Sequence, residues 1–493
     1  MRVGDRPIGF APVAEKEEID RGTWLALIAM GIAVFVIAND FSAINVVIPS
    51  IEEDFDTTVD TTQWVVNAYA LTFGVLIVTG GRLADLFGRR RAFFVGSAIF
   101  AAMSLAGAVA QSEAWLIAAR VLMGVGGALM WPAILGMTFA ALPESKAGLA
   151  GGLVLGAAGL GNAAGPLIGG ALDDLWSWRG IFVLNLPVTA FAAAVTARYI
   201  HQPRPEGADT TIDYRGVITV SVGLVALLLA FDQVLDWGGW GDPRIIGLLG
   251  LFAVGIAAFV FVERSAGRHA LVPGDVMRDR SFTYSCAAIL FMSAVFFAMM
   301  LYLPQYMLKV LDFSAIRTGL GMLPMMGVFA AVSFVAGPLY DRVGPKILAT
   351  AGSGCLAAGP ALVAVAASEQ SYGALLPGLI VTGLGVGLFY PTATTAGVTS
   401  VDESRRSLAG AIIYMFQIAG GSVGLGLTTT VFIESGGGGA GASSFIDGIE
   451  SAFALDAGLA LVGFAICLFL VGGRPHSPFH RRAAGHSPRG HGP

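Results

Sequence analysis

Charged residues are scarce in this sequence. Only 13% of its 493 residues are Asp, Glu, Lys or Arg, whereas 55% are hydrophobic and the mean hydropathy is +0.74. Soluble domains carry about 25% charged residues, so the composition argues against a soluble enzyme or a disordered scaffold. The net charge of −5 provides no basic surface for a polyanion, and we expect no nucleic-acid partner.

Cysteine and the common catalytic motifs are lacking too. The three cysteines, Cys286, Cys355 and Cys467, are isolated in apolar runs, which favours packing over disulfide formation or metal binding. The phosphate-binding P-loop motif and the zinc-binding HExxH motif do not occur, so ATP-driven pumping and zinc proteolysis lack support. We therefore expect no enzyme activity, no catalytic or metal-binding residues and no cofactor.

The sequence is rich instead in long apolar runs. A helix that crosses a bilayer needs about 20 mostly apolar residues, and fourteen such runs lie between charged or Pro/Gly-rich breaks. Their approximate bounds are 23–49, 63–81, 92–110, 114–142, 149–172, 180–200, 215–235, 244–263, 282–308, 317–340, 347–367, 373–399, 408–433 and 453–471. These runs predict an all-α, multi-pass integral membrane protein with fourteen transmembrane helices in a lipid bilayer.

The distribution of basic residues predicts the orientation. With the N-terminus inside, 24 of the 29 lysines and arginines fall in inner segments and four in outer loops, which agrees with the positive-inside rule. The remaining one, Arg120, lies within a span. An even number of spans then places both termini in the cytoplasm, and we expect the protein in the inner (cytoplasmic) membrane.

The two ends of the chain repeat each other. Gly81–Arg89 is similar to Gly337–Lys346, and Gly124–Pro132 is similar to Gly383–Pro391, at offsets of 256 and 259 residues. Matches in register predict two parallel six-helix bundles with two helices inserted between them. This organisation is typical of a transporter with a central cavity, and a single-chain pore is the weaker alternative.

The repeat divides the chain into five parts. We expect a cytoplasmic N-terminal tail (1–22), an N-terminal six-helix bundle (23–200), a linker with two extra helices (201–281), a C-terminal six-helix bundle (282–471) and a cytoplasmic C-terminal tail (472–493).

Several motifs follow one another in a recognisable order. The segment Gly81–Arg90 lies between spans 2 and 3, Arg120 precedes a glycine-rich run from Gly124 in span 4, and Gly161–Gly170 lies in span 5. By these residues the chain resembles the major facilitator superfamily and, within it, the fourteen-helix drug:proton antiporter family of the multidrug efflux type. It departs from the pattern at Met123, where the family usually has glutamine.

The resemblance implies a major facilitator fold and a transport activity. The implied activity is proton-coupled antiport, by alternating access, of amphipathic small molecules such as drugs, antiseptics and antibiotics, with resistance to antibiotics as its consequence. The alternative is export of an endogenous lipid, siderophore or metabolite on the same fold, and a non-transporting receptor or scaffold is a third class. The implied partners are the substrate, protons and the bilayer. The sequence identifies no accessory periplasmic partner.

Two charged residues within spans are candidates for proton coupling. A charge there costs about 2.5–3.5 kcal/mol on insertion scales and marks function by default. Asp40 lies about 13 Å below the outer end of the first helix, expected near Pro49, and Arg120 about 8 Å below the same surface, so Arg120 can reach Asp40. A buried carboxylate beside a cation can change its protonation with conformation. The alternative is a static ion pair, although the matching position in the second half is Leu379.

The loop between spans 2 and 3 is expected to gate the inner side. Asp85 can cap a helix N-terminus across the interface between the bundles, and Asp341 occupies the repeated position. The gating residues are Gly81, Arg82, Asp85, Gly88, Arg89, Arg90, Asp341 and Arg342. Plain positive-inside topology is the alternative, above all for Arg90.

Span 5 carries a stripe of small residues. Gly161, Gly165 and Gly169 recur every four residues, which lets a neighbouring helix approach closely. Pro166 is expected to kink this helix in the first half only. Together with Asn162 these residues form the antiporter motif that the resemblance implies, and a packing face without transport specificity is the alternative.

Substrate contacts are expected where flexible methionines and flat aromatic rings gather, because such side chains suit a promiscuous apolar cavity. The candidates are Asn45, Phe296, Met300, Tyr306, Tyr414 and Gln417. Packing against lipid or within the core is the alternative for each. Acidic residues within spans are few, with Asp232 near the outer end of span 7 and Asp456 at the start of span 14. We therefore expect neutral, zwitterionic or monocationic substrates.

Overall fold

The computed structural model describes residues 19–57, 59–200, 213–234, 237–266, 270–437, 439 and 441–470, and all regular elements in this part of the chain are helical. The long and short α-helices are α1 (Arg21–Ala43), α2 (Ile48–Phe55), α3 (Val59–Phe87), α4 (Arg89–Ala108), α5 (Glu113–Ala141), α6 (Ala147–Leu175), α7 (Arg179–Tyr199), α8 (Tyr214–Gln233), α9 (Pro243–Ala266), α10 (Gly274–Arg278), α11 (Arg280–Lys309), α12 (Ala315–Val343), α13 (Pro345–Ala367), α14 (Tyr372–Ser400), α15 (Arg406–Phe432) and α16 (Ala442–Phe469). Single turns connect some of them: η1 (Ile44–Val46), η2 (Glu144–Lys146), η4 (Glu403–Arg405) and η5 (Ile433–Gly437).

The predicted number of transmembrane helices is confirmed. Among the described residues, fourteen helices are long and apolar enough to cross a membrane, and α2 and α10 are the two short ones that are not. Polar caps set the starts of several spans. For example, the Asp20 carboxylate accepts hydrogen bonds from the first backbone N–H groups of α1, and the Ser112 hydroxyl does the same for α5. Most of the expected N-terminal tail, all of the expected C-terminal tail and residues 201–212 of the expected linker lie outside the described residues.

Three helix boundaries differ from the prediction. Helix α3 runs to Phe87 rather than to residue 81, so Gly81, Arg82 and Asp85, which were expected in a loop, lie in its last two turns. The last span was expected over 453–471, but α16 begins at Ala442, which places Asp456 in the middle of the helix rather than at its start. The first half of α16 follows a Gly/Ser-rich stretch and is amphipathic, since Phe445 and Ile449 are buried and Asp447 is exposed. Its apolar residues therefore do not form a continuous run in the sequence. At the other end of the chain, α1 stops at Ala43, and a separate short helix begins around Pro49.

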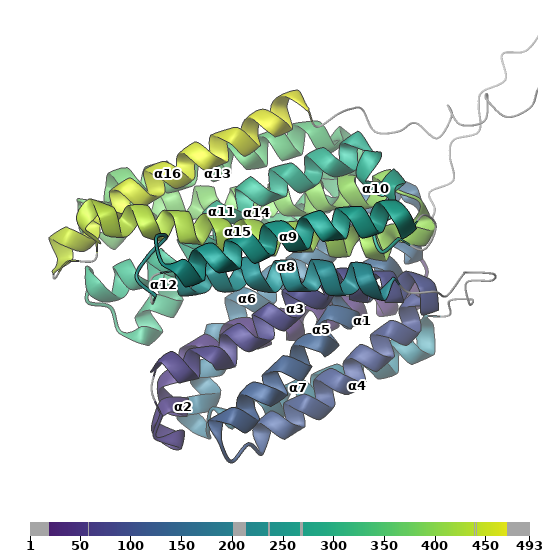
Figure 1. Ribbon diagram of the computed structural model, residues 1–493, viewed down its shortest axis with the longest axis horizontal. Helices are drawn as coiled ribbons and strands as arrows, with labels where there is room; N and C mark the ends of the chain where they lie inside the picture. The colour runs from purple at the N-terminus through teal and green to yellow at the C-terminus, as the bar shows by residue number, and fades with distance from the viewer. Residues whose placement is uncertain are drawn as a thin grey trace, which may run out of the picture.

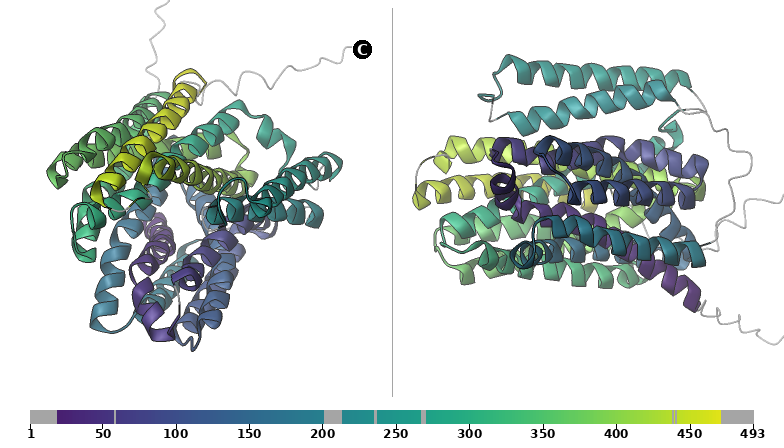
Figure 2. Two further views of the ribbon diagram at one scale, coloured as in Figure 1. Left: turned by 60° about the vertical axis from the view of Figure 1, so that its left-hand side comes forward. Right: turned by 90° about the horizontal axis from the view of Figure 1, so that it is seen from below.

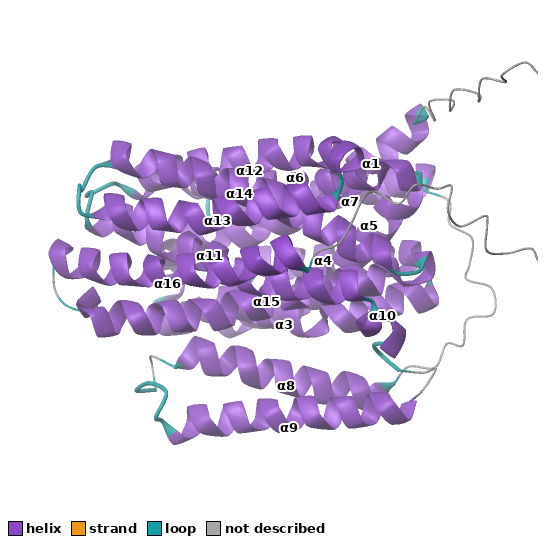
Figure 3. Cartoon of the chain, turned by 90° about the horizontal axis from the view of Figure 1, so that it is seen from above, coloured by secondary structure: helices purple, strands orange, loops and turns teal. Residues whose placement is uncertain are grey.

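The spans form two bundles and a peripheral hairpin. Helices α1 and α3–α7 make one bundle and α11–α16 the other, and the bundles meet where α6 packs on α12 and α3 packs on α15 (Figure 1). Helices α8 and α9 lie side by side outside both bundles (Figures 2 and 3). Helix α8 contacts α15 and α3, whereas α9 packs on α8 and is mostly exposed. The two predicted six-helix bundles with two inserted helices are thus confirmed.

The helices define two ends of the molecule. We call the end that carries the start of α1, the α3–α4 turn and α10 the terminal face, and the end that carries α2 and the α8–α9 turn the opposite face (Figure 1). Close helix contacts between the bundles depend on glycine. A Cβ at Gly152 would approach the Ser333 carbonyl oxygen to 2.8 Å, and one at Gly156 would approach the Phe334 ring to 2.8 Å.

Candidate functional site

The Asp40 and Arg120 side chains meet inside the N-terminal bundle. Arg120 Nη1 on α5 lies 2.5 Å from Asp40 Oδ2 on α1, and both side chains are fully buried. Arg120 Nε also donates a hydrogen bond of 2.8 Å to the Val65 carbonyl oxygen of α3. The pair therefore joins three helices, and each charge has a counter-charge in a place from which water is excluded.

An asparagine completes the carboxylate's surroundings. Asn185 Nδ2 on α7 donates to Asp40 Oδ1 at 2.8 Å and to Ser104 Oγ on α4 at 3.1 Å. Ser104 Oγ in turn donates to the Phe182 carbonyl oxygen at 2.9 Å. Neither Asn185 nor Ser104 is among the site residues predicted from the sequence. The sequence signal that could have identified them is an amide and a hydroxyl inside otherwise apolar spans, because polar groups there need hydrogen-bond partners.

Aromatic rings enclose the guanidinium group. The Arg120 Cζ lies 4.3 Å from the centre of the Tyr69 ring and 6.0 Å from that of Phe182, distances at which a cation is attracted to a ring face. Arg120 Nη2 and the Tyr69 hydroxyl are buried without a hydrogen-bond partner among the described residues. The site thus holds one spare donor on Arg120, which Asp40 does not use in this conformation.

A chain of rings connects the ion pair to the interface between the bundles. Tyr69 stacks on Phe73 with ring centres 5.9 Å apart. Phe73 contacts Tyr414 of α15 at 5.5 Å, and Tyr414 contacts Trp131 of α5 at 4.6 Å. Tyr414, a candidate substrate residue, therefore lies where the two bundles touch, next to the rings that enclose Arg120.

The other candidate substrate residues have different surroundings. Phe296 packs on Phe329 and Tyr390 within the C-terminal bundle. The Tyr306 hydroxyl donates to the Ala367 carbonyl oxygen of α13 at 2.7 Å, so it holds that bundle together. The remaining three are Asn45, which is exposed in η1, and Met300 and Gln417, which are half-buried.

Asp85 links the bundles at the terminal face. Its Oδ2 accepts a hydrogen bond of 2.8 Å from the Leu408 backbone N–H, in the first turn of α15, and its Oδ1 lies 3.2 Å from Arg89 Nε. Arg89 Nη1 donates to the Gly136 carbonyl oxygen at 3.0 Å, and its Nη2 donates to the Glu403 carbonyl oxygen in the other bundle. A carboxylate at a helix N-terminus is electrostatically favourable.

Asp341 repeats this arrangement from the other bundle. Its Oδ1 accepts a hydrogen bond of 2.8 Å from the Gly148 backbone N–H at the start of α6. Each bundle therefore supplies a carboxylate to a helix N-terminus of its partner. An ion pair between Arg406 Nη2 and Glu144 Oε1, 3.4 Å apart, also crosses the interface.

The remaining expected gating residues have different surroundings. Gly88 has φ 99°, which allows the tight α3–α4 turn. A Cβ at Gly81 would approach the Ser407 carbonyl oxygen to 2.9 Å, so this glycine allows α3 to touch α15. Arg90 Nη2 donates to the Ala197 carbonyl oxygen within its own bundle. Arg82 is half-buried and Arg342 is exposed.

An ion pair outside the spans ties α10 to this face. Asp275 pairs with Arg405 of η4. Partial burial opposes ionisation of Asp275, but the hydrogen bond and the charge of Arg405 outweigh it and lower the pKa of the carboxyl below its ordinary value. This carboxyl therefore stays ionised at neutral pH.

The small-residue stripe of α6 packs on the helix that carries Asp40. A Cβ at Gly161 would lie 2.6 Å from the Phe35 carbonyl oxygen, one at Gly165 would overlap Ser42 Oγ, and one at Gly169 would lie 2.7 Å from the Ala43 carbonyl oxygen. The helix continues through Pro166, and Asn162 beside it is half-buried. The stripe thus fixes the position of α1 at the height of the ion pair.

The described part of the chain has the architecture of a secondary transporter, with two repeated bundles, an ion pair buried in one of them and contacts between them concentrated at one face. The Major Facilitator Superfamily family model matches residues 30–425 and 328–491. The chain therefore belongs to the Major Facilitator Superfamily, and its relatives identify the multidrug efflux type.

Two curated relatives cover most of the chain. The puromycin resistance protein pur8 of Streptomyces alboniger is 33% identical over 417 residues, which span 84% of this chain and 82% of that protein. The multidrug resistance protein Stp of Mycobacterium tuberculosis is 33% identical over 414 residues, which span 84% and 76%. Among solved structures, the human organic anion transporter MFSD10 matches with a TM-score of 0.64 over 91% of this chain and 100% of that one. At 12% identity this likeness concerns the fold alone.

Proposed function

We propose that this protein exports amphipathic small molecules across the cytoplasmic membrane in exchange for protons, by alternating access. The observation that supports the proposal best is the buried group formed by Asp40, Arg120 and Asn185. A proton on Asp40 weakens its attraction for Arg120, whose Nη1 donor can then find another acceptor. Protonation and helix position are thereby linked, as an antiporter requires.

The gating contacts agree with an alternating-access cycle. In the proposed orientation the terminal face is cytoplasmic, because the basic residues concentrate there. The carboxylates of Asp85 and Asp341 hold the bundles together at that face. We assign this arrangement to a state that is closed to the cytoplasm, and its opening requires both carboxylates to leave the helix N-termini of the other bundle.

The substrate class follows from the relatives' names and the interface rings. The two relatives are named for puromycin and multidrug resistance. Rings such as Tyr414 and Trp131 offer flat apolar contacts between the bundles. We propose neutral or monocationic amphiphiles as substrates, with the proton gradient as the sole energy source. Export of an endogenous lipid, siderophore or metabolite is the second candidate.

The test uses inverted membrane vesicles that are energised to an acid interior and contain a pH-sensitive dye. A panel of neutral, cationic and anionic amphiphiles is added to wild type and Asp40→Asn. Proton release driven by some compounds in wild type, and lost in the variant, supports the proposal. The matched control is Asp54→Asn, since Asp54 forms a partly exposed ion pair with Arg179 at 2.6 Å.

Two outcomes of this experiment would contradict the proposal. Proton-coupled transport that persists in folded Asp40→Asn would refute the assigned role of Asp40. If no compound in the panel causes proton release with folded wild-type protein, export of an endogenous substrate or coupling to another ion becomes the better hypothesis.

A further inference from the structure

A second buried carboxyl lies in the C-terminal bundle. Asp456 is fully buried in the middle of α16. Its Oδ1 accepts a hydrogen bond of 2.6 Å from Thr428 Oγ1 on α15, and its Oδ2 has no hydrogen-bond partner among the described residues. The structure also gives Asp456 no ion pair within its described part.

Asp456 and Asp40 differ in the donors and counter-charges around their carboxyl groups. Asp40 has a guanidinium and an amide donor, which together stabilise a carboxylate. Asp456 has one neutral hydroxyl donor in an apolar bundle, and an ionised carboxylate without a counter-charge is very unfavourable there. These surroundings stabilise the protonated, neutral carboxyl.

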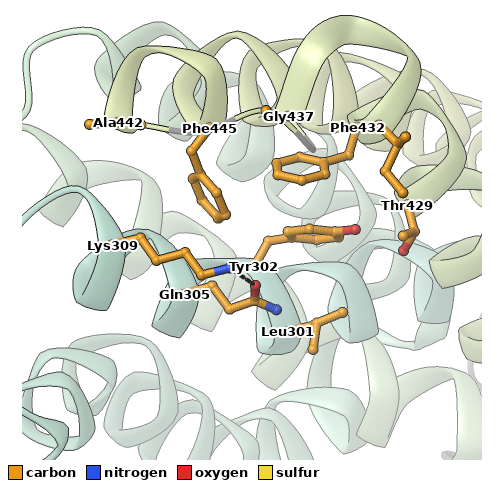
Figure 4. Close-up of a pocket in the computed structure, with 12 residues that line it drawn as sticks. Leu301, Tyr302, Gln305, Lys309, Thr429, Phe432, Gly437, Ala442 and Phe445 are labelled. Carbon is orange, nitrogen blue, oxygen red and sulfur yellow. Dashed lines mark hydrogen bonds between the residues drawn. The ribbon is translucent and has the colours of Figure 1, made fainter.

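A pocket at the opposite face is formed by helices that also surround this carboxyl. It has a volume of about 640 Å³ and lies between the ends of α11, α15 and α16 (Figure 4). Thr429 lines it and directly follows Thr428, the residue that holds Asp456. Tyr302 of α11 also lines it and lies close enough to Asp456 for an electrostatic interaction. The pocket and the carboxyl therefore have α11 and α15 as common neighbours.

We propose that Asp456 is a second proton-binding residue, which exchanges its proton with water at the opposite face through this pocket. In the exchange the carboxyl O–H bond breaks, the electron pair stays on the carboxylate and the proton passes to a water molecule, which becomes hydronium. The Thr428 hydroxyl, which donates to Asp456 Oδ1, is the donor that can stabilise the carboxylate so formed. The role of this site in transport rests on the proposed proton-coupled function.

The charged and titratable groups around Asp456 leave it unpaired. Helix α11 presents Tyr302 and, at the rim of the pocket, Lys309, whose ammonium lies 5.1 Å from the centre of the Phe445 ring. Helix α13 presents Ser353 to Cys467, eleven residues further along α16. On α16 itself Glu450 lies nearer the opposite face, where Glu434 of η5 is exposed.

Infrared difference spectroscopy on the purified protein tests proton binding without transport. Wild type is titrated over pH, and the band of a protonated carboxyl C=O is followed. We expect part of this C=O band to titrate in wild type and to be absent from Asp456→Asn. The same part should remain in Asp447→Asn, because Asp447 is an exposed carboxylate on the same helix. Thr428→Val should move its titration to higher pH, whereas Thr428→Ser should not. An Asp456 band that never titrates, or that does not exist, overturns the proposal.

Transport then tests the coupling. If Asp456 carries one of the exchanged protons, Asp456→Asn lowers the maximum substrate gradient about tenfold for each pH unit of the driving gradient. An unchanged gradient overturns the coupling role. If wild type shows no proton-coupled transport, the proposed function fails, while the infrared titration still decides whether Asp456 binds protons.

Discussion

At the scale of single residues, the Asp40–Arg120 pair is the feature that packing alone does not explain. Removing two charges from water costs several kcal/mol per ion, and the attraction between them repays this only with good geometry. The pair has short contacts, and Asn185 adds a further donor. The second bundle has the buried, apolar Leu379 at the position that matches Arg120, so the fold itself does not require the pair.

The burial of the Asp40–Arg120 pair predicts the effect of removing one partner. Arg120→Met leaves Asp40 as an uncompensated buried charge, and we expect a loss of about 3–5 kcal/mol of stability. Adding Asp40→Asn should restore much of that loss, because the unpaired charge disappears. Thermal unfolding in detergent measures both effects.

The control for this experiment is Asp242→Asn, in the partly exposed pair with Arg244, which should leave the unfolding temperature unchanged. Equal destabilisation in the single and the double variant would show that the pair is not coupled.

At the scale of elements, α6 is the helix that connects the Asp40–Arg120 pair with the contacts at the terminal face. One of its faces packs on α1 through Gly161 and Gly165, and another packs on α12 through Gly148 and Gly152. Glycine is needed on both faces because the neighbouring backbones approach too closely for a Cβ. We therefore expect a movement of α12 against α6 to affect the helix that carries Asp40.

Gly148 provides the prediction at this scale. An added methyl group would overlap the Gly337 carbonyl oxygen and crowd the Asp341 carboxylate, so Gly148→Ala should destabilise the closed terminal face by about 1–3 kcal/mol. The measurement is thermal stability together with substrate export.

The matched control is Gly247→Ala on α9, where an added Cβ meets open space and both quantities should stay at wild-type values. Wild-type behaviour of Gly148→Ala would mean that α6 and α12 do not rely on this close contact.

At the scale of the whole molecule, the two bundles are fastened by reciprocal hydrogen bonds. Asp85 of the N-terminal bundle binds the start of α15, and Asp341 of the C-terminal bundle binds the start of α6. On the opposite face, hydrogen bonds such as Ser50 to Asp173 and Tyr372 to the Gly321 carbonyl join elements of the same bundle. In the proposed cycle, opening of the terminal face breaks the hydrogen bonds of both carboxylates.

Removing these charges should open the terminal face. A hydrogen bond to a charged group contributes about 1.5–3 kcal/mol, so Asp85→Asn should shift the closed-to-open ratio roughly 10- to 100-fold. Asp341→Asn should act in the same direction, and the double variant should shift it further. Spin labels at Arg91 and Lys346, both exposed and on different bundles, would report the change as longer distances, after the native cysteines are replaced.

For this experiment Asp447→Asn is the control, because Asp447 is exposed on α16 and its variant should keep the wild-type distances. Unchanged distances in the Asp85→Asn, Asp341→Asn double variant would contradict the gate.

Fourteen spans, their pairing into repeated bundles and the two in-span charges could be predicted because each depends on local properties of the chain. Apolar length is a property of one segment, and the repeat is visible as matches in register. The boundary of α16 was predicted wrongly because its first half is apolar on one face only, and the burial of Phe445 and Ile449 against other helices decides its length.

The partners of the charges are decided by tertiary structure. Spacing along the chain indicated that Arg120 could reach Asp40, but Asn185 and Ser104 come from other helices, and only packing brings them to the same carboxylate. Packing likewise leaves Asp456 without a counter-charge. The sequence by itself determined the membrane fold, because hydropathy acts within each segment. Tertiary structure decided which buried charges are paired, because hydrogen bonds depend on contacts between residues far apart in the chain.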